Sequence, residues 1–294
     1  MNIIKYRFFF LGLSAFLIAA SIVAVAIFGL RPGIDFVGGA LWEIRVPNLG
    51  ADGIRETLLA TGSSEMTIFP GEQADQFLIR LPHISEEEHQ QYVFALKTKS
   101  PDAEEIRYES IGPTIGGELK KKAYRAIVLV LLGISLYIAF AFRKVSRPIS
   151  SWKYGIVTLL TLFHDIAVPT GLLAVLGKYV GVEVDTNFVV ALLVVMGFSV
   201  HDTIVVFDRI RENLMMSRDR SALASLINES VRQTFARSLN TSLTLFLVLV
   251  ALFFFGPVTL KYFVLTILVG TMVGTYSSIF VASPLLLYFQ GRRG

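Results

Sequence analysis

Two His-Asp pairs stand inside runs of apolar residues, where ionisable side chains are rare. His201 and Asp202 lie within "VVMGFSVHDTIVVFDRIREN", and His164 and Asp165 lie within "TLLTLFHDIAVPTGLLAVLG". An acid at membrane depth is costly, and it usually faces a protein interior or a water-filled cavity and has a function. Both acids are therefore candidates for binding and releasing a coupling ion. The alternative is that each is a buried acid that only holds two helices together.

Neither pair is expected to bind a metal ion. Neighbouring residues on a helix point about 100° apart, so the two members of each pair should face different sides. Two isolated dipeptides also lack the several converging ligands that a metal site requires. His201 is left with two interpretations, a side chain that titrates near neutral pH or a donor to a backbone carbonyl.

Arg237 is the expected partner of Asp202. It opens a later apolar run and is followed by Asn240, Thr241 and Thr244 at the i+3, i+4 and i+7 positions, which form one polar stripe on a helix. A guanidinium keeps its proton, whereas a carboxylate in such a setting can bind and release one. If the distance to Arg237 changes during a cycle, Asp202 can act as a proton relay coupled to motion.

The composition predicts that these residues sit in a membrane protein. Of the 294 residues 53% are apolar and 17% are charged, whereas a soluble domain carries about 25% charged residues. Six runs are long enough to cross a bilayer as helices. The predicted spans are 8–30, 124–142, 154–177, 186–207, 236–256 and 262–289. The first run is too long for the apolar part of a signal peptide, so it is expected to remain as an anchor.

Basic residues gather in the N-terminal tail and in the segments 143–153, 208–235 and 290–294. The positive-inside rule therefore places both termini in the cytoplasm. Residues 208–235 form the cytoplasmic loop, and an apolar stripe within it predicts a helix lying on the membrane surface. Gly270, Gly274 and Ser278, each four residues apart, predict a close-packing face on the last span. Pro169 and Pro284 are expected to kink the third and sixth spans.

Residues 31–118 have the composition of a soluble domain and should lie outside the cytoplasm. Trp42, Ile44 and Val46 alternate with polar residues and predict a strand. Ser85 and Glu88 form a capping box that opens a helix. The predicted order βαββαβ is that of the ferredoxin-like α+β fold. His83 and His89 are expected on the surface, because neither Cys nor a third His accompanies them.

The sequence predicts no enzyme and no cofactor. The chain has no cysteine, which excludes disulfides and cysteine-based metal or redox chemistry. No recognisable catalytic constellation lies in 31–118. The remaining segments, the tail and first span (1–30) and the bundle of the other five spans (119–294), offer only the intramembrane polar residues.

Four stretches together resemble the SecF family of protein-export membrane proteins, within the SecD/SecF family and the RND superfamily. They are "GIDFVGG" (33–39), "SIGPTIGGEL" (110–119), "GFSVHDTIVVFDRIREN" (197–213) and "ARSLNTSLT" (236–244). The resemblance covers essentially the whole chain. It maps the family's intramembrane Asp onto Asp202 and its fifth-span Arg onto Arg237, with Asn240 and Thr241 in the same motif. The family's other motif residues correspond to Gly33, Asp35, Phe36, Gly38, Gly39, Gly112 and Pro113.

The resemblance implies an accessory subunit of the Sec protein translocase in the bacterial inner membrane. Such a subunit works with SecD, the SecYEG channel and often YajC, and uses the proton motive force to promote late protein export. His201 stands where the family usually has Asn. Two alternatives stay open: half of a proton-coupled small-molecule exporter, or a membrane scaffold without ion coupling. A carboxylate serves protons or sodium ions, so the coupling ion is also open.

Overall fold

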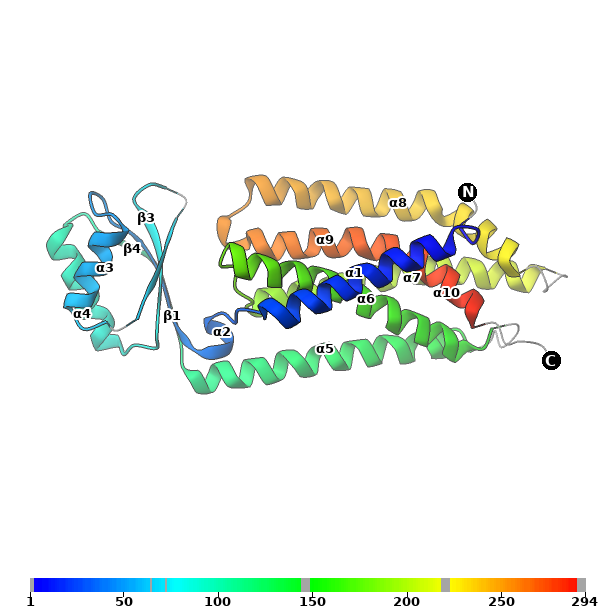
Figure 1. Ribbon diagram of the computed structural model, residues 1–294, viewed down its shortest axis with the longest axis horizontal. Helices are drawn as coiled ribbons and strands as arrows, with labels where there is room; N and C mark the ends of the chain where they lie inside the picture. Colours follow the sequence, from blue (N-terminus) through cyan, green and yellow to red (C-terminus); the bar gives the residue numbers. More distant parts are fainter. Residues whose placement is uncertain (1–2, 64, 72, 144–148, 218–222, 290–294) are drawn as a thin grey trace. The chain divides into compact units, whose positions relative to one another are not determined.

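The computed structural model describes residues 3–63, 65–71, 73–143, 149–217 and 223–289. Parts of the basic segments used for the orientation argument, 144–148, 218–222 and 290–294, lie outside the described residues. The chain divides into two compact units (Figure 1). One unit comprises Met1–Arg31 with Arg125–Gly294, and the other comprises Pro32–Tyr124.

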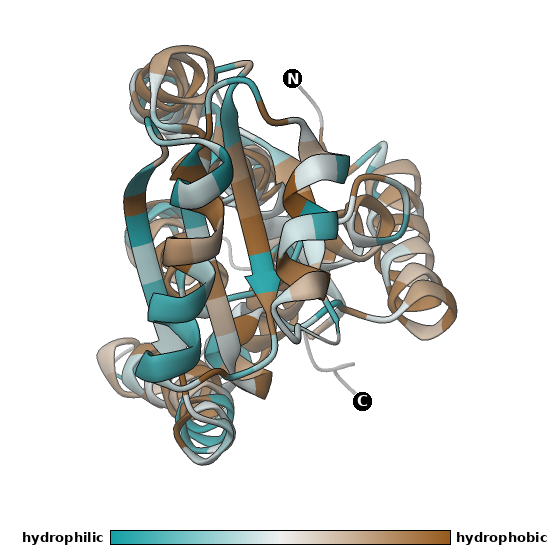
Figure 2. Ribbon diagram, turned by 90° about the vertical axis from the view of Figure 1, so that its left-hand side faces the viewer, coloured by the Kyte–Doolittle hydropathy of each residue, from teal (hydrophilic) through white to brown (hydrophobic). Residues whose placement is uncertain are grey.

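The first unit is helical, and the prediction of six spans is confirmed. Among the described residues, six helical stretches are long and apolar enough to cross a membrane. Figure 2 shows these long helices coloured mostly as hydrophobic. They are α1 (Arg7–Phe28), α5 (Pro113–Ala141), α6 (Ser151–Tyr179), α7 (Thr186–Met216), α8 (Leu223–Phe255) and a composite last span. The first part of α5, up to Tyr124, belongs to the second unit. The last span joins a 3-10 turn (Val258–Leu260), α9 (Lys261–Ser277), a π-helical turn (Ser278–Ala282) and α10 (Ser283–Tyr288).

Three helices extend well beyond the predicted spans. Helix α5 begins at Pro113 rather than at 124, α7 ends at Met216 rather than at 207, and α8 begins at Leu223 rather than at 236. The stretch expected to lie as a separate helix on the membrane surface is therefore the first part of α8. Its apolar residues Leu223, Ile227 and Val231 are buried in a protein core with residues of α7, so they pack against protein instead of a membrane surface.

Proline affects the two kink positions differently. Pro169 lies inside α6, which continues through it. Pro284 is the second residue after the π-helical turn. Proline lacks an N–H, and its ring clashes with the carbonyl one turn earlier. The wider π turn before Pro284 relieves this clash. π turns are rare and often lie at functional sites, and this one adjoins the polar network described below.

Small residues allow close approach of the inner helices. A β-carbon on Gly270 would lie 2.3 Å from a Val195 methyl, and one on Gly274 would lie 3.0 Å from the Ser199 β-carbon. The predicted close-packing face on the last span is thus confirmed, and its partner is α7. The same device joins α1 to α6, where a β-carbon on Gly171 would lie 2.5 Å from the Ser21 α-carbon.

We expect Gly171→Ala to destabilise the bundle, because the added methyl must push the α1 backbone away from α6. Overpacking of this kind costs about 1–3 kcal/mol. Thermal unfolding in detergent micelles should show a lower midpoint than wild type. Gly133→Ala on α5 is the matched control, because nothing lies within 4 Å of its added methyl. Equal midpoints for the two variants would contradict the close packing of α1 on α6.

The second unit is a four-stranded sheet with two helices. Its elements are α2 (Ile34–Val37), β1 (Gly39–Arg45), α3 (Ala51–Ala60), β2 (Thr67–Pro70), β3 (Gln76–Leu81), α4 (Glu86–Lys99) and β4 (Glu104–Ile111). The strands are antiparallel in the spatial order β2-β3-β1-β4. Trp42, Ile44 and Val46 are each at most 2% exposed, as the alternation predicted. The predicted capping box of Ser85 and Glu88 opens α4.

His89 was expected on the surface, but it is buried. Its Nε2 lies 2.7 Å from an oxygen of Glu105, which also accepts a 2.7 Å hydrogen bond from the Trp42 indole. The imidazole stacks on Tyr108 with ring centroids 3.7 Å apart. These partners come from β1 and β4, which lie far from α4 in sequence, so the local pattern gave no signal of burial. His83 is exposed, as predicted.

Burial raises the pKa of Tyr108 above its ordinary value, and this outweighs the opposing hydrogen bond with Ser110. The folded state therefore retains the phenol proton at pH values where the unfolded chain loses it. Stability from this group is present below about pH 10 and falls as the pH rises further. Tyr108→Phe keeps the ring stack and should reduce the alkaline loss of stability. Urea unfolding followed by Trp42 fluorescence in a Trp152→Phe background, at pH 8 and pH 10.5, checks this difference.

Candidate functional site

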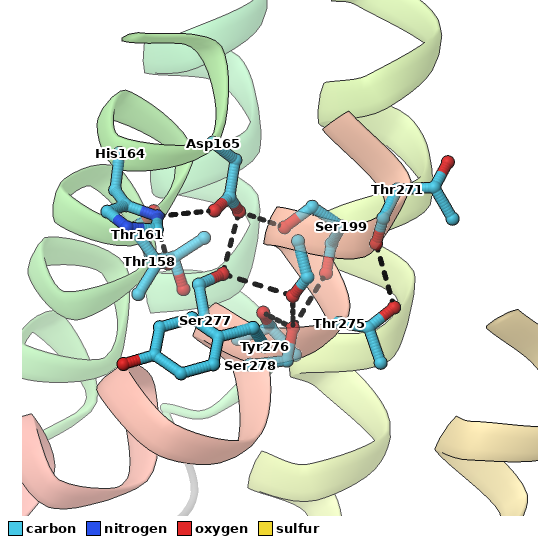
Figure 3. A network of polar contacts seen from close by, with 12 residues as sticks. Thr158, Thr161, His164, Asp165, Ser199, Thr271, Thr275, Tyr276, Ser277 and Ser278 are labelled. Carbon is cyan, nitrogen blue, oxygen red and sulfur yellow. Dashed lines mark hydrogen bonds and ion pairs between the residues drawn. The ribbon is translucent and has the colours of Figure 1, made fainter. Parts of the chain in front are cut away.

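A buried polar network surrounds Asp165 on α6 (Figure 3). The Asp165 side chain is fully buried. One carboxylate oxygen accepts hydrogen bonds from Ser199 on α7 and from Ser277 on α9, the latter at 2.8 Å. The other oxygen lies 2.9 Å from His164 Nδ1. Asp165 thus joins α6, α7 and the last span through one carboxylate.

The contact between His164 and Asp165 corrects the expectation that neighbouring residues must point apart. The 100° between their α-carbon positions does not prevent the imidazole from bending back to the carboxylate. His164 is 1% exposed, and its Nε2 has no hydrogen-bond partner among the described residues. The second pair behaves as expected, because His201 is exposed whereas Asp202 is buried.

Asp202 lies on the inner side of α7 and is 6% exposed. The side chains of Ser238 on α8 and Ser278 in the π turn lie close to its carboxyl group. Ser278 is already engaged, with Thr203 at 2.9 Å and the Gly274 carbonyl at 2.9 Å. By contrast, Asp202 Oδ2 and Ser238 Oγ are both buried and have no hydrogen-bond partner within the described parts of the chain.

The expected pairing of Asp202 with Arg237 is not formed. Arg237 is exposed on α8, and no ion pair joins it to Asp202 in the described structure. The next residue, Ser238, is the one that faces Asp202. Asn240 and Thr241 share the exposed side with Arg237, so the polar stripe exists but faces away from the protein interior.

Sequence reasoning missed the serines that line the interior. Ser199, Ser238, Ser242, Ser277 and Ser278 are all buried. Serine is a weak signal in an apolar helix, because its hydroxyl can bond to the carbonyl one turn earlier. Ser242 does this with the Ser238 carbonyl at 2.8 Å. Four of these serines lie near an acid on another helix: Ser199 and Ser277 donate to Asp165, and Ser238 and Ser278 lie close to Asp202.

The glycine-rich motifs at 33–39 and 110–119 belong to the sheet-containing unit and serve its packing. Gly38 and Gly39 have φ of +81° and +133°, which favour glycine. A β-carbon on Gly38 would lie 2.8 Å from Pro113, and one on Gly116 would lie 2.9 Å from the Gly38 nitrogen. The first motif, which contains Gly33, Asp35 and Phe36 and includes α2, therefore packs against the second motif. The second motif contains Gly112 and forms the start of α5.

The chemistry that this arrangement supports is the holding and release of protons within the bundle. Two acids and one histidine lie buried together with hydroxyls, which can both donate and accept hydrogen bonds. Asp165 already has three hydrogen-bonded neighbours, whereas Asp202 keeps an unpartnered oxygen. No group of three or more His, Asp or Glu residues in the described segments is arranged to hold a metal ion.

Comparison with known proteins gives the same family throughout. The family model described as "Protein export membrane protein SecD/SecF, C-terminal" matches residues 91–292. The protein translocase subunit SecF of Thermobaculum terrenum is 42% identical, over 99% of this chain and 95% of that protein. The SecF of Anaerolinea thermophila is 35% identical, over 99% of this chain and 94% of that protein.

A fused relative is also similar. The protein translocase subunit SecDF of Thermus thermophilus is 35% identical, over all of this chain but 40% of the longer protein. The crystal structure of SecDF, described as a translocon-associated membrane protein, matches with a TM-score of 0.85 at 33% identity. That match covers 99% of this chain and 39% of the solved one. Six apolar helices, the four motifs and these matches agree, and the chain is a multi-pass membrane protein that belongs to the SecD/SecF family of protein-export membrane proteins.

Proposed function

We propose that the chain is a SecF-type accessory subunit of the Sec translocase that uses the proton motive force to promote late protein export. The observation that carries the coupling step is Asp202, a buried acid with an unpartnered oxygen on an inner helix. Buried acids in membrane spans mark ion pathways in most cases. Asp165, held by donors from two other helices, transmits the protonation state of the bundle to α6 and α7.

The proposed partner is a SecD protein, which supplies the other half of the coupling unit. Arg237, Asn240 and Thr241 are exposed on an apolar helix, where they would meet lipid in an isolated chain. Polar groups in a bilayer need partners. A second membrane half covering this stripe brings Arg237 into a protein interface. The relatives in which SecD and SecF are one chain support this arrangement.

The proposal places both termini in the cytoplasm and the ferredoxin-like unit, within 31–118, outside the bacterial inner membrane. That unit would move with the protonation cycle and hold or release an emerging polypeptide. SecYEG and YajC are the further expected partners. The proposed function requires no catalysis and no cofactor, because the only small species it uses is the coupling ion. His201 is exposed beside Asp202 on α7 and would modulate the pH range of coupling.

Reconstitution tests the proposal. The purified chain, SecD and SecYEG are combined in proteoliposomes, and export of a secretory protein is measured under an imposed pH gradient or an imposed sodium gradient. Stimulation by the pH gradient alone is expected. Stimulation by the sodium gradient alone would identify sodium, instead of the proton, as the coupling ion. Equal export without any gradient would favour the scaffold alternative. Transport of small toxic compounds without an effect on export would favour the exporter alternative.

A further inference from the structure

A bulge in the sheet turns an acid toward the buried His89 on α4. Strand β4 pairs with β1 in a register that shifts between Glu43 and Ile44, so that Glu105 lies opposite Ile44 and Ile106 is skipped. Ile44 is buried, and residues opposite each other on paired strands share a face. Glu105 therefore faces α4, while the apolar Ile106 is 45% exposed. Bulges of this kind re-aim a side chain and are features of a fold, not defects.

Both ring nitrogens of His89 face carboxylate oxygens. Nε2 lies 2.7 Å from Glu105 Oε2, the same oxygen that accepts the Trp42 indole N–H. Nδ1 lies 3.6 Å from Glu86 Oε1, and it is buried without a hydrogen bond in the described structure. A carboxylate only accepts hydrogen bonds, and a neutral imidazole has one N–H. The neutral ring therefore leaves a nitrogen lone pair facing a carboxylate, whereas the imidazolium presents a donor to each acid.

The groups around the ring favour the same positive charge. Tyr108 stacks on the imidazole with 9° between the ring planes, an arrangement that attracts a cation. The hydrogen bond from Gln90 lowers the pKa of Glu86, with a smaller contribution from His89. The titratable groups that face this part of α4 are three acids and a phenol, namely Glu86 and Glu88 on α4 and Glu105 and Tyr108 on β4. The neighbouring α3 buries only uncharged residues, which are Ile54, Thr57 and Leu58.

We propose that the sheet-containing unit carries a latch that closes in acid, in which the His89 imidazolium bridges Glu86 on α4 to Glu105 on β4. The bridge needs the second N–H, so it is present at acidic pH and is lost as the pH rises through the titration of the imidazole. The inference goes beyond the proposed function and takes from it only the placement of this unit outside the membrane, on the side that the proton motive force acidifies. Helix α4 is then held most firmly against the sheet when the gradient is large.

Trp42 fluorescence reports the protonation of His89. The two rings meet edge to face with centroids 5.3 Å apart, and an imidazolium quenches indole emission more strongly than a neutral imidazole does. In a Trp152→Phe background Trp42 is the sole tryptophan. The full chain is titrated in detergent micelles from pH 8 to pH 5. Emission should fall in a one-proton transition that is absent in His89→Gln.

Two acid variants test the bridge itself. Glu86→Gln changes a side chain that is 68% exposed, so folding is unaffected, and it removes the carboxylate from Nδ1. Glu105→Gln removes the charge beside Nε2. Each should lower the midpoint of the Trp42 transition, Glu105→Gln by about one pH unit, which is a tenfold change in proton affinity. Glu104→Gln is the matched control and should keep the wild-type midpoint, because this neighbouring acid pairs with Arg45.

Hydrogen exchange tests whether protonation holds α4 in place. Protection factors of the α4 amides, corrected for intrinsic exchange rates, should be about tenfold higher at pH 5 than at pH 8 in the wild-type chain. The difference should vanish in His89→Gln. Equal protection at the two pH values in wild type would show that His89 titrates without holding α4, and the latch would be abandoned.

An unchanged midpoint in both Glu86→Gln and Glu105→Gln would also overturn the inference, as would an equal fall in Glu104→Gln. Neither readout requires export. If the wild-type protein shows no proton-driven export, the proposed function fails while fluorescence and hydrogen exchange still decide the latch. If export is proton-driven and Trp42 shows no transition, the latch alone fails.

Discussion

Asp202→Asn is expected to reduce proton-driven export to the level seen without a pH gradient, while the chain still folds and still associates with SecD. The amide matches the carboxyl group in size but cannot bind and release a proton at physiological pH. The bundle tolerates it because Asp202 Oδ2 has no hydrogen bond to lose in the described structure. Export into proteoliposomes with and without an imposed gradient measures the effect, and co-purification measures association.

Asp208→Asn is the matched control for this experiment. Asp208 lies six positions later on α7, its side chain is 65% exposed, and it pairs with Arg211 at 3.5 Å. An exposed pair of this kind contributes little to stability, and gradient-driven export should be unchanged. Wild-type stimulation in Asp202→Asn would remove Asp202 from the coupling path. Loss of association in the same variant would instead support a scaffold role.

The largest effect on stability is expected for Asp165→Ala. Its carboxylate receives hydrogen bonds from Ser199 and Ser277, and His164 lies 2.9 Å away. Alanine leaves Ser199 and His164 buried without this acceptor, while Ser277 keeps its bond to the Gly274 carbonyl, and it opens a cavity between three helices. The cost should reach at least about 3 kcal/mol, because each stranded buried polar group carries its own desolvation penalty. Thermal unfolding in detergent micelles should show a clear drop in the midpoint.

Thr271→Val provides a matched control on the last span. Thr271 is 1% exposed and its hydroxyl has no partner in the described structure, so the isosteric change removes a group that bonds to nothing. Its midpoint should equal or exceed that of wild type. If Asp165→Ala unfolded at the wild-type midpoint, the network around Asp165 would have no structural role, and its contacts would have to be assigned to function alone.

Much of the fold could be predicted from local patterns. Each apolar run is long enough to cross a bilayer, and backbone groups in lipid must be satisfied within the helix, so six spans followed directly. In the sheet-containing unit the alternation at Trp42, Ile44 and Val46 and the cap at Ser85 are local signals. Helix ends were less predictable. Helices α5, α7 and α8 continue through polar residues, because helical hydrogen bonding does not stop where hydropathy falls.

The candidate site was only partly predictable. Asp202 and Asp165 stood out because ionisable residues in apolar runs are rare and costly. Their partners did not, because serine occurs in many helices without a functional role. His89 shows the same limit in the other unit: its burial depends on Glu105, Trp42 and Tyr108, which strand pairing brings to α4.

The sequence by itself determined the six apolar spans, the βαββαβ order of the sheet-containing unit apart from α2, the family, and the two acids within apolar runs. Only the tertiary structure decided which side of each helix faces inward. Lipid is as apolar as a protein core, so hydropathy does not distinguish the two sides of a span. On α8 a rotation of about 100° separates Arg237 from Ser238. Packing against α7 and the last span turned Ser238 toward Asp202 and left Arg237 exposed.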